Sequence, residues 1–213
     1  NPTLFRAASP RIRPAPASQI AAARGMVEHC QVKKEDIFLG ALPFNHVGGI
    51  TCAVLTSLLA GCPLLLIPAP DLEMIITQCK RRGVNIMGGV PTLYTLLFMH
   101  PAIHDWDKSG VRLVITGGSN AEPDLLTTLT DNFTNATVMN LYGLSETSGP
   151  VVLSPWDSGR DRLLKSIGVP VGDAEVKVMD DNGKELPPGE TGELDFKGGA
   201  VCGSYFQMPE ARA

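Results

Sequence analysis

The segment NLYGLSETSG, residues 140–149, places one carboxylate among hydroxyls and glycines directly after an apolar run. Tyr142 offers a ring that could stack on a nucleobase, and Ser145 offers a hydroxyl. Glu146 is a hard oxygen ligand of the kind that Mg²⁺ takes. The same carboxylate could be an acid in the first turn of a helix, although Gly143 stands where the hydroxyl of a capping box would be. The segment predicts a nucleotide and metal site, with a glycine-rich structural turn as the alternative.

Three other loops of similar composition follow predicted strands. They are PFNHVGG at 43–49, MGGVPT at 87–92 and TGGSN at 116–120. Glycine pairs let the backbone approach a ligand closely, and ligands of doubly wound sheets bind beyond the carboxyl ends of the strands. Any one of these loops is an ordinary turn between a strand and a helix, whereas several in succession favour a shared site.

His46 lies in the first of these loops, between a strand end and an apolar helix. A lone histidine at such a place either caps the helix or lines the site. Hydrolase chemistry lacks support, because the chain has neither a Ser/His/Asp order nor a G-x-S-x-G elbow. The segment GGSNAEPD is not a phosphate-binding P-loop, since it lacks Gly-Lys-Ser/Thr.

These loops need a sheet to position them, and the chain predicts one. Apolar strands are expected at 37–42, 63–67, 84–90, 111–118 and 137–143, alternating with helices at 18–30, 47–60, 71–82, 91–100 and 122–133. Ser18 and Asp71 are the expected N-caps of the first and third helices, and Gly61 and Gly83 are expected stops. Strands that are apolar along their whole length indicate an α/β fold with a mostly parallel sheet flanked by helices.

The pattern changes towards the end of the chain. Short alternating segments surround the turn sequences DDNG and PPGETG, and in ELDF the residues Leu194 and Phe196 share one face. We therefore expect three parts: an irregular tail over 1–17, an α/β unit over 18–167, and part of a small antiparallel β unit over 168–213.

The composition of the 213 residues is that of a globular protein, with 44% hydrophobic and 19% charged residues. The net charge of −4 leaves no basic excess for nucleic acid. Five unclustered cysteines indicate neither a zinc site nor disulfides, which favours a reducing, cytoplasmic setting. The apolar stretch 50–70 is interrupted by Gly61 and Pro63, so we expect a buried helix and strand there rather than a transmembrane segment. No signal peptide is visible.

In this order the loops resemble those of the adenylate-forming superfamily, and acyl-CoA synthetases above all. YGLSE resembles the family's Tyr-Gly-x-Thr-Glu signature, with Ser145 in place of Thr, and LPFNHVGG resembles its Pro-x-x-His-x-x-Gly loop. The segments GVPTLY, VRLVITGGSNAEPDLL and the stretch from SIGVPVGD to QMPEA also match, so that the likeness covers about 18–211.

The resemblance implies that a carboxylic acid, a fatty acid in the simplest case, reacts with ATP and Mg²⁺ to an acyl-adenylate, which passes to coenzyme A. It implies catalytic roles for His46, Ser145 and Glu146, with Ser145 on phosphate, Glu146 on the metal and His46 between the acyl chain and the α-phosphate. It implies a nucleotide site that binds ATP or AMP, formed by Gly117, Gly118, Ser119, Asn140, Leu141, Tyr142 and Gly143, with Tyr142 stacked on adenine. Val90 and Gly143, with His46, would border the acyl pocket.

The chain departs from the family in three respects that matter for activity. The family's phosphate loop, with its lysine, should lie just before the helix at 18–30, where this chain has RAASPRIRPAPAS. The family's ribose-binding Asp and C-terminal lid are not in the sequence either. We therefore expect a central fragment that is inactive alone. The alternatives are a non-catalytic nucleotide-binding or interaction module, and an adenylation domain of another subfamily. An amino-acid-activating domain is disfavoured, because no acid stands in PFNHVGGITC to pair with a substrate amine.

Overall fold

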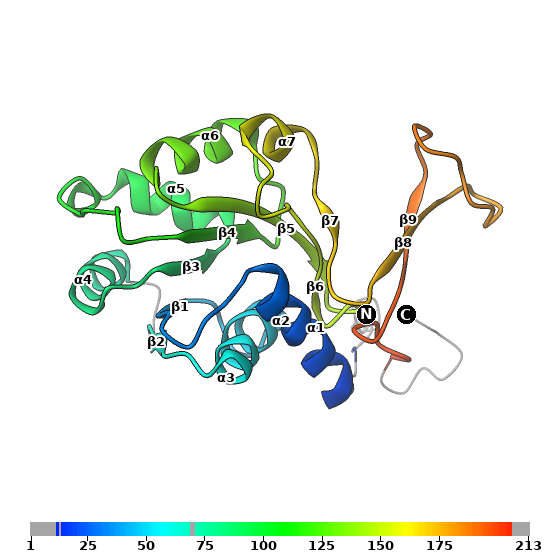
Figure 1. Ribbon diagram of the computed structural model, residues 1–213, viewed down its shortest axis with the longest axis horizontal. Helices are drawn as coiled ribbons and strands as arrows, with labels where there is room; N and C mark the ends of the chain where they lie inside the picture. The colour runs from blue at the N-terminus through cyan, green and yellow to red at the C-terminus, as the bar shows by residue number, and fades with distance from the viewer. Residues whose placement is uncertain (1–11, 13, 69–70, 206–213) are drawn as a thin grey trace, which may run out of the picture.

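The computed structural model describes residue 12, residues 14–68 and residues 71–205. Its centre is a seven-stranded sheet with the strand order β2-β1-β3-β4-β5-β6-β7 (Figure 1). Five strands run parallel, namely β1 Phe38–Gly40, β2 Leu64–Leu66, β3 Ile86–Gly89, β4 Leu113–Gly117 and β5 Thr137–Leu144. The strands β6 Gly149–Leu153 and β7 Val169–Pro170 continue the sheet in antiparallel pairings. The predicted mostly parallel sheet is confirmed.

Helices cover both faces of this sheet (Figure 1). One face carries α1 Pro16–His29, α2 Val47–Gly49, the π-helix η1 Ile50–Leu55 and α3 Thr56–Ala60. The other carries α4 Leu72–Arg82, α5 Pro91–Met99, the 3₁₀-helix η2 Pro101–Ile103, α6 Pro123–Asn132 and α7 Arg160–Lys165. The apolar strands are therefore buried between two helical layers, as in α/β proteins generally.

Two separate hydrophobic cores result, one under each helical layer. The core beneath α4 to α7 includes Cys79, Leu97 and Leu126, and the core beneath α1, η1 and α3 includes Met26 and Phe38. Three of the cysteines, Cys30, Cys52 and Cys62, belong to this second core. All five cysteines are unpaired and buried.

The predicted ends of α4 are confirmed, whereas the predicted start of the first helix and the predicted burial of one strand are wrong. Asp71 caps α4 by accepting a hydrogen bond from the Met74 amide at 2.9 Å, and Gly83 ends it in the left-handed conformation. Ser18 is not the N-cap of the first helix, because the helix already begins at Pro16, a residue suited to the first helical position. The strand at 63–67 was expected to be buried, but β2 lies at the sheet edge and 54% of Leu66 is exposed. The tail predicted at 1–17 lies mostly outside the described residues.

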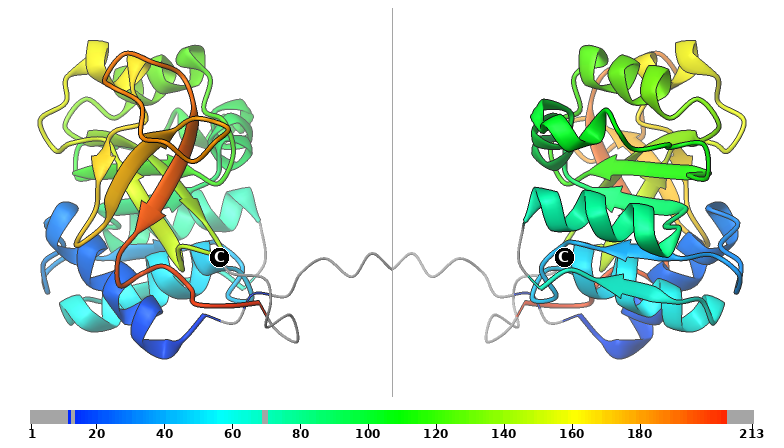
Figure 2. Two further views of the ribbon diagram at one scale, coloured as in Figure 1. Left: turned by 90° about the vertical axis from the view of Figure 1, so that its right-hand side faces the viewer. Right: turned by 90° about the vertical axis from the view of Figure 1, so that its left-hand side faces the viewer.

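A second, two-stranded sheet consists of β8 Glu175–Met179 and β9 Glu193–Lys197, paired antiparallel. It stands beside the β6–β7 end of the large sheet, and Figure 2 shows it crossing in front of that end. Val176 pairs with Phe196 and Val178 with Leu194, so these side chains share one face, as the alternation in ELDF predicts. The antiparallel β portion is confirmed for the part of the chain that the structure describes.

At the amino ends of the parallel strands, opposite the predicted site, one buried carboxylate joins three strands. Asp36 precedes β1 and accepts hydrogen bonds from Nε of Arg112 at 2.7 Å and Nδ2 of Asn85 at 3.0 Å. A second guanidinium nitrogen of Arg112 also contacts the carboxylate, and the guanidinium lies 5.5 Å from the ring centroid of Trp156. This cluster therefore links the amino ends of β1, β3 and β4, whereas the predicted site lies at the carboxyl ends of the strands.

Candidate nucleotide and acyl site

The segment 140–149 forms the end of β5, a turn over 145–148 and the start of β6. It is therefore a β-hairpin, and the alternative that placed Glu146 in the first turn of a helix is wrong. The hairpin is tight at its base, since a Cβ atom added to Gly143 would lie 2.0 Å from the carbonyl oxygen of Gly149. Ser148 takes a positive φ of 55°. Position 143 thus requires glycine for close approach of the two strands.

Thr147 fixes the conformation of this turn from the inside. Its Oγ1 accepts a hydrogen bond from the Leu144 amide at 3.0 Å and donates one to the Gly149 carbonyl at 2.7 Å, and the residue is buried. Ser145 and Glu146, in contrast, are half-exposed. The turn therefore separates a structural hydroxyl from a hydroxyl and a carboxylate that are open to a ligand.

The segment 198–205, which follows β9, packs against the same turn. The Cys202 amide donates to the carbonyl oxygen of Glu146 at 2.7 Å, and Sγ of the buried Cys202 lies 3.5 Å from Oγ of Ser148. The Tyr205 hydroxyl donates to Oε1 of Glu146 at 3.1 Å. These contacts join residues 54 to 59 positions apart, so no local pattern in the sequence predicts them.

The ring of Tyr142 is also supported from the small sheet. It stacks on the ring of Phe196, with the centroids 5.9 Å apart and the planes inclined by 29°. Tyr142 is half-buried, so one face of the ring contacts Phe196 and the residue still reaches the surface. Phe196 was predicted only as part of an amphipathic strand.

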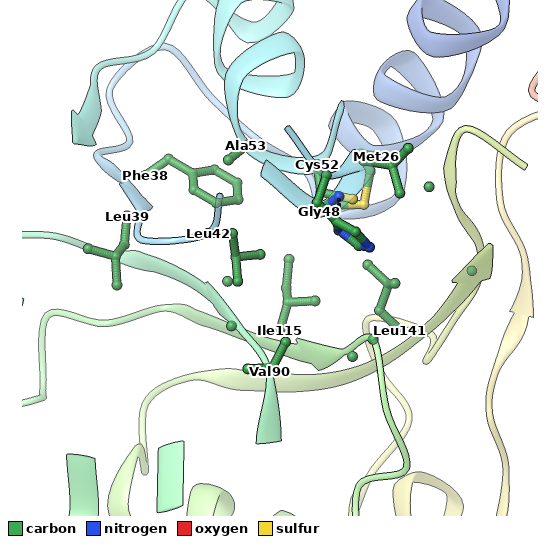
Figure 3. Close-up of a pocket in the computed structure, with 18 residues that line it drawn as sticks. Met26, Phe38, Leu39, Leu42, Gly48, Cys52, Ala53, Val90, Ile115 and Leu141 are labelled. Carbon is green, nitrogen blue, oxygen red and sulfur yellow. Dashed lines mark hydrogen bonds between the residues drawn. The ribbon is translucent and has the colours of Figure 1, made fainter. Parts of the chain in front are cut away.

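An apolar pocket lies between the α1–η1 layer and the sheet (Figure 3). The space between its walls is about 680 Å³ when the open solvent at the mouth is included, and the part that can hold the centre of a water-sized molecule is about 80 Å³. Six of the predicted site residues line it: His46, Val90, Gly117, Gly118, Leu141 and Gly143. Sequence reasoning missed the buried part of the wall, formed by Met26, Phe38, Leu39, Cys52, Ala53 and Ile115. These residues carry no signal besides hydrophobicity.

His46 fulfils both roles that the sequence left open. It is the N-cap of α2, with Nδ1 accepting a hydrogen bond from the Gly48 amide at 3.0 Å, and its exposed ring lines the pocket mouth. Because Nδ1 is the acceptor, the neutral imidazole carries its proton on Nε2. His46 therefore presents a hydrogen-bond donor at an otherwise apolar opening.

The walls of the pocket carry no charge. Burial raises the pKa of the Cys52 thiol to about 12, so this thiol is protonated at neutral pH. Neither an acidic nor a lysine or arginine side chain is among the described residues that line the pocket. An uncharged, apolar group fits this space, with a polar end at His46.

The remaining predicted residues lie outside the pocket, on its polar side. Gly117 pairs with Leu141 and Thr116 with Asn140, which places the loop after β4 beside the end of β5. Ser119 is exposed in that loop, and the Asn140 amide donates to Oγ of Ser154 at 3.0 Å. The structure thus brings the predicted residues to two neighbouring strand ends, where the apolar pocket adjoins the turn 145–148.

The chain is thus an α/β protein with a mostly parallel sheet, glycine-rich loops at its carboxyl edge, and an apolar pocket beside a carboxylate. The family described as AMP-binding enzyme matches residues 16–206, and this chain belongs to that family of adenylate-forming enzymes. The membership covers nearly all described residues.

Similar proteins include acid–CoA ligases. The 4-coumarate-CoA ligase 2 of Narcissus pseudonarcissus is 30% identical over 183 residues, which are 84% of this chain and 32% of that protein. The long-chain-fatty-acid–CoA ligase of Haemophilus influenzae is 31% identical over 172 residues, or 80% of this chain and 30% of that protein. The chain spans about a third of the length of these relatives.

A solved structure of ATP-bound MatB from Rhodopseudomonas palustris superposes on this chain with a TM-score of 0.80 and 28% identity. It covers 91% of this chain and 38% of the MatB chain. Within the residues that the structure describes, every helix is too short or too polar to cross a membrane.

Proposed function

We propose that this chain is the nucleotide-binding and acyl-binding part of an AMP-forming acid–thiol ligase. In the reaction, the carboxylate of an acid, here a fatty acid, attacks the α-phosphate of ATP, which gives acyl-AMP and releases pyrophosphate. The thiol of coenzyme A then takes the acyl group, and AMP is released. The observation that carries the proposal is the uncharged pocket with His46 at its mouth, next to the oxygen donors of the turn. The names of the fatty-acid and coumarate ligases among its relatives support it.

We propose the following roles for the chain's residues, which the family resemblance implies and their positions support. The acyl chain would enter the pocket beside Val90 and Gly143, and its carboxylate would stay at the mouth, where Nε2–H of His46 can donate a hydrogen bond. Tyr142 would carry the adenine ring, next to the loop of Gly117, Gly118 and Ser119, and the strand segment Asn140–Leu141 supports this site. Ser145 would donate to a phosphate oxygen. Most of the catalysis would be positioning and charge neutralisation at the α-phosphate.

The residues present fit Mg²⁺. The turn offers a carboxylate and a hydroxyl, which are hard oxygen donors, and both are half-exposed. No group of three or more His, Cys, Asp or Glu side chains suited to a metal occurs in the described part of the chain. A cation at Glu146 would therefore take its other ligands from phosphate and water. When bound, Mg²⁺ would neutralise phosphate charge.

We further propose that the 213 residues bind nucleotide without completing the reaction, since the family's lysine-bearing phosphate loop is not in their sequence. Pyrophosphate release with ATP, Mg²⁺ and a panel of fatty acids tests this, and clear turnover would contradict it. Five unpaired cysteines support a cytoplasmic setting.

The acyl pocket can be tested by filling it. Ala53→Phe places a ring in the wall of the pocket, and Leu58→Phe places the same ring on the exposed side of α3 as a control. The probe is a non-hydrolysable alkyl ester of AMP, with binding measured by calorimetry. Ala53→Phe should weaken binding of the long alkyl ester strongly and binding of AMP little, and Leu58→Phe should change neither. Equal binding of the alkyl ester to all three proteins would contradict an acyl role for this pocket.

A further inference from the structure

One contact at the turn is made by a residue that the proposed function has not used. The Tyr205 hydroxyl donates a 3.1 Å hydrogen bond to Oε1 of Glu146, and no other side chain in the described part of the chain is recorded as donating to this carboxylate. The bond occupies one carboxylate oxygen only. Oε2 therefore remains able to bind a cation.

This bond is not needed to pack the segment 198–205 against the turn. The packing is already provided by Cys202, through its amide bond to the Glu146 carbonyl and its buried side chain. Tyr205 is held independently on its other side, where its backbone forms an antiparallel bridge with Ile12. The hydroxyl thus reaches Glu146 from a backbone that is anchored at two places.

The donor in this contact is the phenol hydroxyl of Tyr205, and the acceptor is the carboxylate of Glu146. The contact is therefore a hydrogen bond from a neutral donor to a charged acceptor.

We infer that Tyr205 is a positioning residue for the metal–nucleotide site, holding Glu146 through Oε1 in the orientation in which Oε2 meets the cation. The inference rests on the proposed function, in which Glu146 binds the metal. An unrestrained glutamate must lose rotamer freedom when it binds a cation, and Tyr205 removes part of that cost before the cation arrives. Loss of the hydroxyl should therefore weaken binding of the metal-bound nucleotide more than binding of the nucleotide alone.

The experiment measures this coupling on the 213-residue chain. ATP binding is measured in EDTA and again with Mn²⁺, and Mn²⁺ binding is followed by the loss of the free-ion EPR signal. Tyr205→Phe removes only the hydroxyl. Ser204→Ala removes the hydroxyl of the exposed neighbouring residue and is the matched control. Glu146→Gln removes the proposed ligand charge. Thermal unfolding of each variant shows whether it is folded.

We expect Tyr205→Phe to weaken MnATP binding roughly tenfold, the size of the rotamer freedom that a glutamate side chain loses when it is fixed, and to leave ATP binding in EDTA unchanged. Ser204→Ala should bind MnATP as the unmodified chain does. In Glu146→Gln, Mn²⁺ should no longer increase the affinity for ATP. The inference is overturned if Tyr205→Phe binds MnATP normally, or weakens both forms equally, while Glu146→Gln loses the metal effect. If Glu146→Gln retains the full metal effect, or the unmodified chain binds no MnATP, the proposed function itself fails.

Discussion

The rings of Tyr142 and Phe196 stack with 5.9 Å between their centroids, and they join β5 of the large sheet to β9 of the small one. The contact is the point at which the small sheet can influence the proposed nucleotide site. An adenine ring on Tyr142 would have to use the face that Phe196 leaves open. The small sheet would thus fix the orientation of the platform.

Phe196→Leu should weaken AMP binding by about 0.5–1.5 kcal/mol, the typical contribution of an aromatic pair. Leu194→Ala, on the same face of β9 but 39% exposed, is the control and should have little effect. Calorimetric titration with AMP measures both. Unchanged affinity in Phe196→Leu would mean that Tyr142 is oriented without help from the small sheet.

Glu146→Gln in an intact ligase that contains this chain should slow adenylation strongly while barely changing its stability. The substitution keeps the shape of the side chain and an acceptor for Tyr205, and it removes the charge that would hold Mg²⁺. Pyrophosphate release as a function of Mg²⁺ concentration is the measurement. A variant with the normal rate and normal Mg²⁺ dependence would reduce the segment to a structural turn.

Gly143→Ala should destabilise the chain by roughly 2–4 kcal/mol, because the new methyl group would lie 2.0 Å from the Gly149 carbonyl oxygen and force the hairpin apart. Gly110→Ala is the matched control, since a Cβ there meets no atom within 4 Å and its φ is not positive. Urea unfolding compares them. Equal stability of the two variants would show that β5 and β6 can separate without cost.

Asp36 should make the stability of the chain depend on pH. Burial alone would raise the pKa of this carboxyl, but hydrogen bonds from Arg112, the Lys33 amide and Asn85 outweigh it and lower the pKa below the ordinary value of 3.8. A lowered pKa in the folded chain means that the stabilisation is complete at neutral pH and is lost as the pH falls below about 3.8 towards the folded value.

Asp36→Asn should therefore lower the free energy of unfolding by about 2–3 kcal/mol at pH 7, less than for a fully buried pair because Arg112 is partly exposed. It should also reduce the loss of stability at acidic pH, which we call the acid limb of the stability curve. Asp105→Asn, at an exposed position, should leave the limb as it is. Urea unfolding at several pH values, followed by tryptophan fluorescence, measures the effect. An unchanged acid limb in Asp36→Asn would assign the acid sensitivity to other carboxylates.

Much of the α/β fold could be predicted from local patterns. The strands β1 and β3 are apolar throughout and β4 is apolar except for Thr116, and α4 has a capping acid at Asp71 and a stop at Gly83. The prediction of Ser18 as the N-cap was wrong because the first helix begins two residues earlier, at Pro16. The strand β6 was missed because Pro150 and a register shift at Tyr142/Gly143 obscure a short apolar run that follows a turn.

The candidate site could be predicted only where it is local. His46, the glycine loops and the segment 140–149 stand out by composition, and the resemblance to a family supplied their proposed roles. The support given by Phe196, Cys202 and Tyr205 depends on contacts across 54 to 59 residues, or between two sheets. Such contacts arise from the packing of the whole chain, so no short stretch of sequence contains them.

The cysteines are distributed so that they can report on the opening of different parts of the molecule. Cys79 lies in one core, Cys30, Cys52 and Cys62 in the other, and Cys202 behind the turn 145–148. Burial raises the pKa of Cys30 and Cys79 to about 12, so these thiols react with alkylating reagents only when their surroundings open. Labelling rates at individual cysteines therefore measure, layer by layer, the free energies of local opening.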